Sequence, residues 1–230
     1  MMAFDPLQAA AIDGRLGGQV PMQAPLRDAA GQPVTLAALA NGRPILLAPV
    51  QHRCKNLCGY TLNGLSDGLR QAGLTKVTVV AFGIDPRETS ADSAATQARL
   101  PALHAVTAGE TQIQAVTRAL GYRFAYDAQE DQFAHLSAVA VLTPDGRLSS
   151  WLYGLQPPAP VLKAAIGAAS QGGLGAVGQR ILLLCYHYDP VSGRYTSRIE
   201  TALKVSAVGA VLLLGGFVGL SLLRERRTRP

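Results

Sequence analysis

Two runs of hydrophobic residues mark the first half of the chain. Residues 44–50 and 76–84 are of strand length and mostly apolar, which is typical of central strands covered on both faces of a sheet. Between them, Leu62, Leu65 and Leu69 recur at helical spacing among polar neighbours. This spacing predicts a helix over 58–72 that stops at Gly73.

The second half of the chain alternates in the same way. The pattern predicts a helix, a short strand, a second helix, the two strands of a hairpin and a last helix, at residues 91–100, 103–106, 111–120, 137–142, 147–153 and 161–170. Thr89 or Ser90 can cap the first of these helices, and Thr143-Pro144-Asp145-Gly146 is a strong hairpin-turn sequence. The order predicts an α/β fold of the thioredoxin-like plan, a mixed sheet flanked by helices.

The composition changes on either side of this pattern. Residues 1–40 mix Gly, Pro and Ala with polar residues and predict an extended lead-in, with a short hairpin near residues 29–32. We expect the thioredoxin-like domain to span residues 41–172. Three glycines between positions 172 and 175 then indicate a joint before a membrane-proximal segment, residues 173–203.

Residues 205–223 contain no charged side chain and are long enough to cross a hydrocarbon layer of about 30 Å. A core helix normally keeps a polar face, whereas this run has only two serines and some glycines. We therefore expect a transmembrane helix over 204–223. The arginine-rich residues 224–230 favour a cytoplasmic tail, with a single pass through a bacterial inner membrane and the main domain in the periplasm.

The first residues of the chain show no basic stretch followed by an apolar one, so no signal sequence is visible. We expect the true start to lie upstream of Met1. The alternative is a cytoplasmic domain on a tail anchor.

The net charge of +6 does not indicate nucleic-acid binding. The basic excess belongs to the C-terminal tail, and no basic stripe interleaved with aromatic residues appears elsewhere. Three cysteines are too few for a disulfide-stapled fold or for a four-cysteine iron–sulfur cluster. Hydrolytic catalysis finds no support, because no serine or acid pair has a recognisable setting.

Cys54 and Cys58 follow directly on the first apolar strand, where the predicted helix begins. The partial positive charge of a helix N-terminus lowers the pKa of a thiol, and Arg53 and Lys55 act in the same direction. Cys54 and Cys58 are four positions apart across the junction of loop and helix, a spacing that can bring two sulfurs close enough for a disulfide or for joint binding of one soft metal ion. The alternative is two buried cysteines without a chemical role.

A third ligand would have to come from a distant histidine, because imidazole and thiolates together suit copper or zinc. His135 comes just before a predicted hairpin strand, which in a thioredoxin-like plan starts at the same end of the sheet as the cysteine pair. His104 begins a different strand and His52 is expected to be flexible, so both are weaker candidates. A loop histidine without a special role is the alternative for His135.

Cys185 and His187 form a second, speculative soft site near the C-terminus. Spaced by one residue on an extended strand, their side chains would face the same way. The alternative is a membrane-proximal segment that packs on the domain.

Several motifs together, in this order, resemble the Sco/SenC copper chaperones of cytochrome c oxidase assembly. They are the cysteine pair, residues 57–65 after it, Gly83-Ile84-Asp85-Pro86-Arg87-Glu88-Thr89, the segment around His135, Leu142-Thr143-Pro144-Asp145-Gly146-Arg147, and residues 185–190 and 193–195 ahead of a C-terminal span. The resemblance covers the chain from about Asn41 to that span.

The resemblance implies a copper site and assigns its residues. Cys54 and Cys58 become the copper thiolates and His135 the third ligand, while Asp85 becomes a nearby carboxylate that supports the site or partner docking. One position departs from the family pattern. The family usually has Pro, often followed by Met, where this chain has Lys55-Asn56, which adds a positive charge beside a cation site.

The leading hypothesis is a membrane-anchored chaperone that binds Cu(I) or Cu(II) for the copper centre of cytochrome c oxidase subunit II or another copper protein. Such a protein is a carrier and not an enzyme. The alternative is a thiol–disulfide oxidoreductase that keeps the target's cysteines reduced, with Cys54 and Cys58 as its redox pair. A third hypothesis is a copper sensor or assembly scaffold.

Overall fold

The computed structural model describes residues 10–13, 16–54, 58–175, 188–189 and 194–195. The chain divides into two units, Met1–Leu182 and Leu183–Pro230. In the second unit, the described strands β12 (Tyr188–Asp189) and β13 (Arg194–Tyr195) pair antiparallel. The predicted membrane span and the pair Cys185 and His187 lie outside the described residues. No helix within the described part of the chain is long and apolar enough to cross a membrane.

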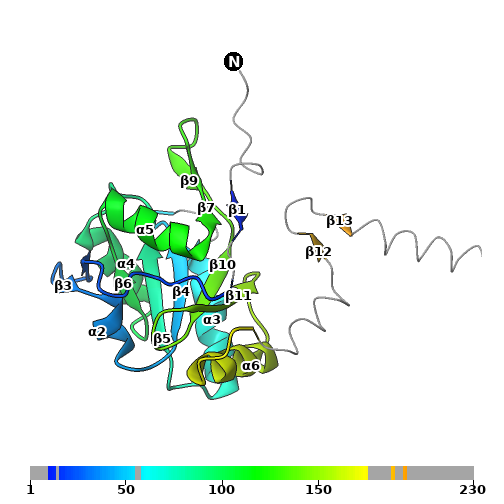
Figure 1. The fold of residues 1–230 in the computed structure, drawn as a ribbon. Coiled ribbons are helices and arrows are strands. Elements are labelled where there is room, and N and C mark those ends of the chain that lie inside the picture. Colours follow the sequence, from blue (N-terminus) through cyan, green and yellow to red (C-terminus); the bar gives the residue numbers. More distant parts are fainter. Residues whose placement is uncertain (1–9, 14–15, 55–57, 176–187, 190–193, 196–230) are drawn as a thin grey trace, which may run out of the picture. The chain divides into compact units, whose positions relative to one another are not determined.

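A five-stranded mixed sheet forms the centre of the first unit (Figure 1). Strands β4 (Ile45–Val50), β5 (Thr78–Gly83) and β6 (His104–Val106) run parallel, in that order. On the other side of β4 lies β10 (Ala138–Leu142), antiparallel to it, and β11 (Leu148–Tyr153) is the outermost strand on that side. This arrangement confirms the predicted mixed sheet of a thioredoxin-like fold.

The central strand β4 is buried on both faces because helices cover both sides of the sheet. Its alternate residues enter two separate cores, Ile45 and Leu47 on one face and Leu46 and Ala48 on the other. Complete burial of each of the larger side chains among these, Ile45, Leu46 and Leu47, stabilises the fold by about 1.5–3 kcal/mol. The helices α3 (Cys58–Ala72) and α6 (Ala159–Ser170) supply residues to the second core, while α2 (Leu36–Ala40) and α5 (Glu110–Leu120) supply residues to the first.

The predicted elements are present, with ends that shift by one or two residues. The helix α4 (Ser90–Arg99) has Thr89 as its N-cap, and the Asp92 carboxylate accepts the Thr89 N–H at 2.7 Å. The helix α6 begins at Ala159, earlier than predicted, because Pro160 is compatible with the first turn of a helix. The predicted turn between β10 and β11 is confirmed, and Gly146 adopts there a left-handed backbone with φ of 86°.

The residues before Asn41 are more ordered than the expected extended lead-in. They contain α2 and the short strands β1 (Ala11–Ile12), β2 (Leu26–Arg27) and β3 (Pro33–Val34). Strands β2 and β3 form the hairpin expected near residues 29–32. The five-residue helix α2 is too short to give a periodic pattern, but the Thr35 hydroxyl caps it by accepting the Ala38 N–H at 3.2 Å.

Three short strands between α5 and β10 were not predicted. They are β7 (Tyr122–Arg123), which pairs with β1, and the hairpin formed by β8 (Ala125–Asp127) and β9 (Gln132–Ala134). The hairpin leads directly into His135, so it sets where this residue lies relative to the sheet.

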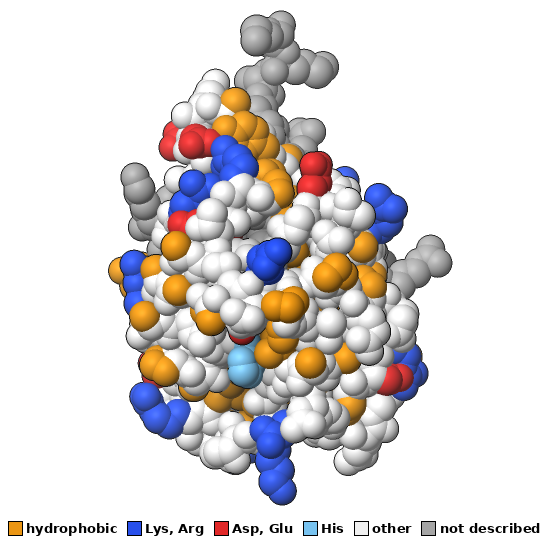
Figure 2. Space-filling view, turned by 90° about the vertical axis from the view of Figure 1, so that its left-hand side faces the viewer, with side chains coloured by type: hydrophobic (Ala, Val, Ile, Leu, Met, Phe, Trp, Pro, Cys, Tyr) orange, Lys and Arg blue, Asp and Glu red, His pale blue; other side chains and the backbone are white. Residues whose placement is uncertain are grey.

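Charged side chains are spread over the surface of the described residues. On the face drawn in Figure 2, Lys and Arg side chains are scattered, some of them beside Asp or Glu side chains, and form no continuous basic patch there.

Candidate functional site

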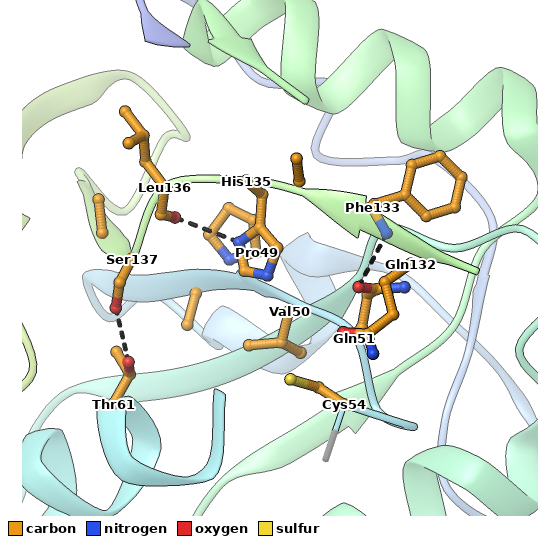
Figure 3. A pocket seen from close by; sticks show the side chains of 13 residues that line it. Pro49, Val50, Gln51, Cys54, Thr61, Gln132, Phe133, His135, Leu136 and Ser137 are labelled. Carbon is orange, nitrogen blue, oxygen red and sulfur yellow. Dashed lines mark hydrogen bonds between the residues drawn. The ribbon is translucent and has the colours of Figure 1, made fainter. Parts of the chain in front are cut away.

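Cys54 and His135 line the same pocket, which has a volume of about 280 Å³ (Figure 3). They are brought together by the antiparallel pairing of β4 with β10, in which Leu47 lies opposite Ala140 and Ile45 opposite Leu142. Because of this pairing, the end of β4 and the start of β10 meet at one edge of the sheet. Cys54 follows β4 and His135 precedes β10, so both lie at that edge, as the sequence predicts.

The turn that carries Cys54 is fixed by backbone hydrogen bonds. The Cys54 N–H donates to the Gln51 carbonyl at 3.1 Å, and the Arg53 N–H donates to Glu88 Oε1 at 2.9 Å. Cys58 is the first residue of α3, so its backbone stands at a helix N-terminus as predicted. The Cys58 side chain and residues 55–57 lie outside the described part of the chain. The joint action of the two sulfurs therefore stays a prediction.

Hydrogen bonding with Tyr122 and Leu136 selects one tautomer of His135. The Tyr122 hydroxyl donates to the Leu136 carbonyl at 2.5 Å and lies 3.0 Å from His135 Nδ1. Since the phenol proton goes to the carbonyl, Nδ1 must donate, to Tyr122 or to Leu136 O at 3.2 Å. The proton is then on Nδ1, and Nε2 carries the lone pair that a metal ion could accept.

Burial lowers the pKa of His135 below its ordinary value, against the opposing effects of the Leu136 carbonyl and of the Cys54 charge. The imidazole is therefore neutral at pH 7, which is the form that binds metal ions.

Tyr122 is itself fixed by packing. Its ring stacks on Trp151 of β11, with ring centroids 5.7 Å apart and an angle of 22° between the planes. The residue that orients His135 is thus part of the core of the sheet.

The rest of the pocket is mainly apolar. Pro49, Val50, Phe133 and Leu136 contribute to its wall. The hydroxyl groups of Thr61 and Ser137 lie 2.6 Å apart and join α3 to the segment between His135 and β10. An apolar wall limits the access of water to whatever the thiolate and imidazole hold.

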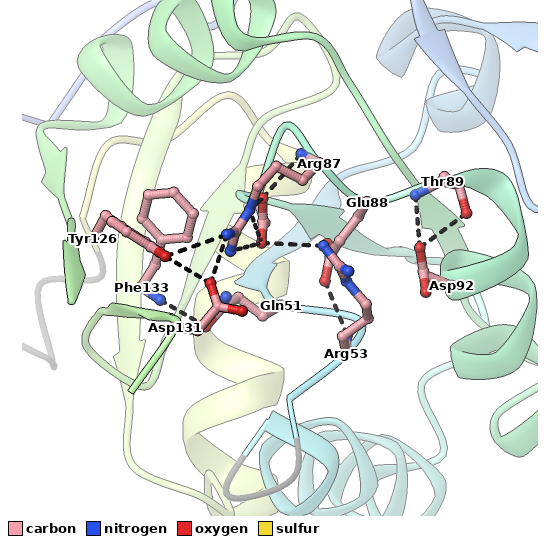
Figure 4. A network of polar contacts seen from close by, with 10 residues as sticks. Gln51, Arg53, Arg87, Glu88, Thr89, Asp92, Tyr126, Asp131 and Phe133 are labelled. Carbon is pink, nitrogen blue, oxygen red and sulfur yellow. Dashed lines mark hydrogen bonds and ion pairs between the residues drawn. The ribbon is translucent and has the colours of Figure 1, made fainter. Parts of the chain in front are cut away.

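Asp85, the predicted supporting carboxylate, lies behind the Cys54 turn and not in the pocket. It is almost fully buried, and Arg87 donates to both of its oxygens, with Nε to Oδ1 at 2.8 Å and Nη2 to Oδ2 at 2.7 Å. Arg53 Nη2 lies 3.5 Å from Oδ2 (Figure 4). Burial alone would raise the pKa of Asp85, but the hydrogen bonds and charge of Arg87, together with the charge of Arg53, lower it. The carboxylate is therefore ionised and tied to the residue before Cys54.

Gln51 contributes a contact that was not predicted from the sequence. Its side chain is buried, and its Oε1 accepts the Phe133 N–H at 3.1 Å. The bond joins the Cys54 turn directly to β9, the strand that leads to His135. A glutamine that follows a buried strand carries no signal of such a role in the sequence.

The expectation that His52 is flexible is wrong. Its ring is buried, Nε2 donates to the Val106 carbonyl at 3.0 Å, and Nδ1 lies 3.1 Å from Thr96 Oγ1. Burial lowers the pKa of His52, so the ring is a neutral link between the Cys54 turn and the neighbouring elements. His104 is exposed at the start of β6 and does not line the pocket.

No group of three or more His, Cys, Asp or Glu side chains is placed to hold a metal ion within the described part of the chain. The predicted set of three ligands includes Cys58, whose side chain is outside that part. His135 and Cys54 are the two predicted ligands whose side chains can be placed, and they share the pocket.

The fold and the pocket define a thioredoxin-like protein with a thiol and an imidazole at the end of its central strand. The sequence model of the SCO1/SenC family matches residues 19–169, so this chain belongs to that family. No curated protein matches the chain.

Solved structures of low sequence identity share the fold. A putative electron transfer protein from Aquifex aeolicus is 24% identical, with a TM-score of 0.63 over 68% of this chain and 95% of that one. ScoI from Bradyrhizobium japonicum, solved with copper bound, is 22% identical, with a TM-score of 0.54 over 68% of this chain and 99% of that one. BsSco, described with a disulfide switch, is 20% identical, with a TM-score of 0.57 over 69% of this chain and 97% of that one.

Glu88 makes the stability of the fold depend on pH. Its side chain is buried, and its Oε2 has no hydrogen-bond partner among the described residues. Burial raises the pKa of Glu88 to about 7, against the hydrogen bond from the Arg53 N–H. The folded protein therefore holds the proton more tightly than the unfolded chain, and stability is lost as the pH rises through this range.

We expect Glu88→Gln to remove this loss. Between about pH 4 and pH 8, the free energy of unfolding of the wild type should fall by about 3 kcal/mol relative to that of the variant, at about 1.4 kcal/mol per pKa unit. Urea denaturation of the reduced full chain across this range measures the difference. Two curves that stay parallel would show that Glu88 titrates normally.

Proposed function

We propose that the chain is a copper chaperone that holds its cargo between Cys54, Cys58 and His135. The observation that carries the proposal is that Cys54 and His135 line one apolar-walled pocket, with the lone pair of His135 on Nε2. Thiolates are soft ligands that favour Cu(I), and a neutral imidazole completes a site for copper. The cysteine pair must be reduced to accept the ion.

Delivery would take place by exchange of ligands. The thiolates of an acceptor protein replace Cys54, Cys58 and His135 one after another, so that the ion is never released into water. The pocket remains partly open, with Cys54 only half-buried, which leaves room for an incoming sulfur. We propose the copper centre of cytochrome c oxidase subunit II as the acceptor. The description of BsSco as a member of the Sco family of cytochrome c oxidase assembly proteins supports this choice.

The first test is a Cu(I) titration of the reduced full chain against a coloured chelator. We expect sub-nanomolar binding in the wild type. In Cys54→Ala and His135→Ala, binding should weaken by more than the roughly 10–100-fold that loss of a ligand's outer partner costs. His104→Ala is the matched control, because this histidine is exposed and does not line the pocket. Absence of tight binding by the wild type would rule out the chaperone.

A second candidate function is thiol–disulfide exchange with the cysteines of the acceptor. Cys58 begins α3, where a helix N-terminus favours a thiolate, and this observation supports redox use of the pair. In the exchange, the target disulfide gains two electrons and two protons, while Cys54 and Cys58 lose the same and form a disulfide. The positive charge of Lys55 between the cysteines also favours the thiolate form that this reaction needs.

The two functions differ in their need for His135. A chaperone needs the imidazole, so His135→Ala should abolish oxidase assembly in a strain whose own copy is deleted, as Cys54→Ala should. An oxidoreductase needs only the thiols, so His135→Ala should leave assembly intact. Cytochrome c oxidase activity of isolated membranes measures the outcome. Normal activity with His135→Ala would favour the oxidoreductase.

We further propose that residues 204–223 anchor the chain in the bacterial inner membrane, with the main domain in the periplasm. The uncharged run and the arginines after it support this topology.

Single-cysteine variants test the topology. In a background in which Cys54, Cys58 and Cys185 are serine, Lys163→Cys places a thiol on the exposed side of α6, and Thr228→Cys places one in the tail. A membrane-impermeant thiol reagent should label the first in intact spheroplasts and the second only after the membrane is opened. The reverse pattern would place the domain in the cytoplasm.

A further inference from the structure

Arg87 lies against both strands of the hairpin that leads to His135. Tyr126 of β8 and Phe133 of β9 are paired in register, and the guanidinium carbon of Arg87 lies 4.9 Å from the Tyr126 ring centroid and 5.8 Å from that of Phe133. A guanidinium at these distances is attracted to aromatic rings. Because the two rings belong to different strands, Arg87 contacts the hairpin as a unit.

The same guanidinium also reaches the turn of the hairpin. Arg87 Nη1 donates to Asp131 Oδ1 at 2.6 Å, and the Tyr126 hydroxyl donates to the same oxygen at 2.6 Å (Figure 4). Asp131 has a φ of 49°, a left-handed conformation that its place in the tight turn requires. Arg87 therefore contacts both strands of the hairpin and the turn between them.

The other side of Arg87 is fixed to the buried carboxylate of Asp85. Besides the three side-chain bonds, the Arg87 backbone N–H donates to Asp85 Oδ1 at 2.9 Å. Asp85 also forms the ion pair with Arg53, the residue before Cys54. One buried carboxylate is thus connected through two arginines to the hairpin before His135 and to the turn before Cys54.

We propose that Arg87 is a positioning residue that holds the His135 hairpin over the Cys54 turn, with Asp85 as its anchor. The inference rests on the proposed copper site and states what fixes the position of His135 relative to Cys54 in it. His135 directly follows β9, so a shift of the hairpin moves the imidazole relative to Cys54. The direct bond between Gln51 and Phe133 aligns the two segments, and Arg87 keeps the hairpin from lifting away.

Substitution of Arg87 tests the inference in the full chain. Arg87→Gln should weaken Cu(I) binding by roughly 10–100-fold, as expected for an outer partner of a ligand. Arg87→Lys should give an intermediate loss, because lysine keeps the charge but has no planar fork to bridge Asp85 and the rings. Arg70→Gln is the matched control, since Arg70 pairs with Asp67 at 2.9 Å on the exposed surface of α3.

A double variant separates positioning of His135 from other effects. In the His135→Ala background, Arg87→Gln should cause no further loss of Cu(I) affinity, because its effect passes through the imidazole. An equal loss with and without His135 would overturn the inference, and so would a wild-type affinity in Arg87→Gln. The electron paramagnetic resonance spectrum of the Cu(II) form should also show an altered nitrogen coupling of the imidazole in Arg87→Gln and an unchanged one in Arg70→Gln.

A measurement without metal keeps this inference separate from the proposed function. If the wild type binds no copper, the chaperone is ruled out, and the exchange rate of the Phe133 amide hydrogen decides about Arg87. Exchange at least about tenfold faster in Arg87→Gln than in Arg70→Gln supports the inference, because this amide is protected only while the hairpin is in place. Equal rates overturn it.

If Arg87→Gln does not fold, Asp131→Asn decides the inference. This change removes only the charge at the exposed turn of the hairpin, which Arg87 Nη1 contacts. A smaller loss of Cu(I) affinity than that expected for Arg87→Gln, together with faster Phe133 exchange, supports it. Unchanged affinity and exchange overturn it.

Discussion

The antiparallel pairing of β4 with β10 is the constraint on which the site depends. β4 is buried on both faces and lies between β5 and β10, so its register is fixed by two partners and two cores. A shift of one residue would exchange the side chains that face the two cores, which makes slippage costly. Since β5 is parallel to β4 and β10 is antiparallel, the loops after β4 and β5 and the segment before β10 meet at one edge. These three segments carry Cys54, Asp85 and His135.

Two buried carboxylates, Asp85 and Glu88, lie near this edge and differ in how far hydrogen bonds and ion pairs compensate them. Asp85 is buried, and two arginines with outer ends in solvent compensate its charge. Glu88 is buried beside it with one oxygen that lacks a partner among the described residues, and burial raises the pKa of this carboxyl. Burial of carboxylates costs free energy unless they are paired. Here the buried carboxylates and their arginines fix the turn before Cys54 and the hairpin before His135. The free energy that their burial costs is offset by contacts that also define the geometry of the pocket.

The sequence predicts the strands and helices of the core well, because burial on both faces gives β4 and β5 continuous apolar runs and α3 shows a helical spacing of leucines. The pairing of Cys54 with His135 in one pocket also follows from the order of the elements. The hairpin of β8 and β9 could not be predicted in this way. Its strands have three residues each, too few for a periodic pattern, and contacts made by Arg87 and Gln51 hold it in place. The buried position of His52 could not be predicted for a similar reason, since its hydrogen-bond partners, Thr96 and Val106, are distant in the sequence.

Tyr122 connects His135 of the pocket to a tryptophan in the core. Its hydroxyl touches the imidazole of His135, and its ring lies on Trp151, which is the only tryptophan in the chain. The indole is therefore separated from the candidate metal-binding nitrogen only by one phenol and one imidazole ring. Light of a wavelength longer than tyrosine absorbs excites this single side chain selectively, and its emission responds to changes in the charge and position of its neighbours. The protein thus carries its own fluorescent reporter of events at His135, without any added label.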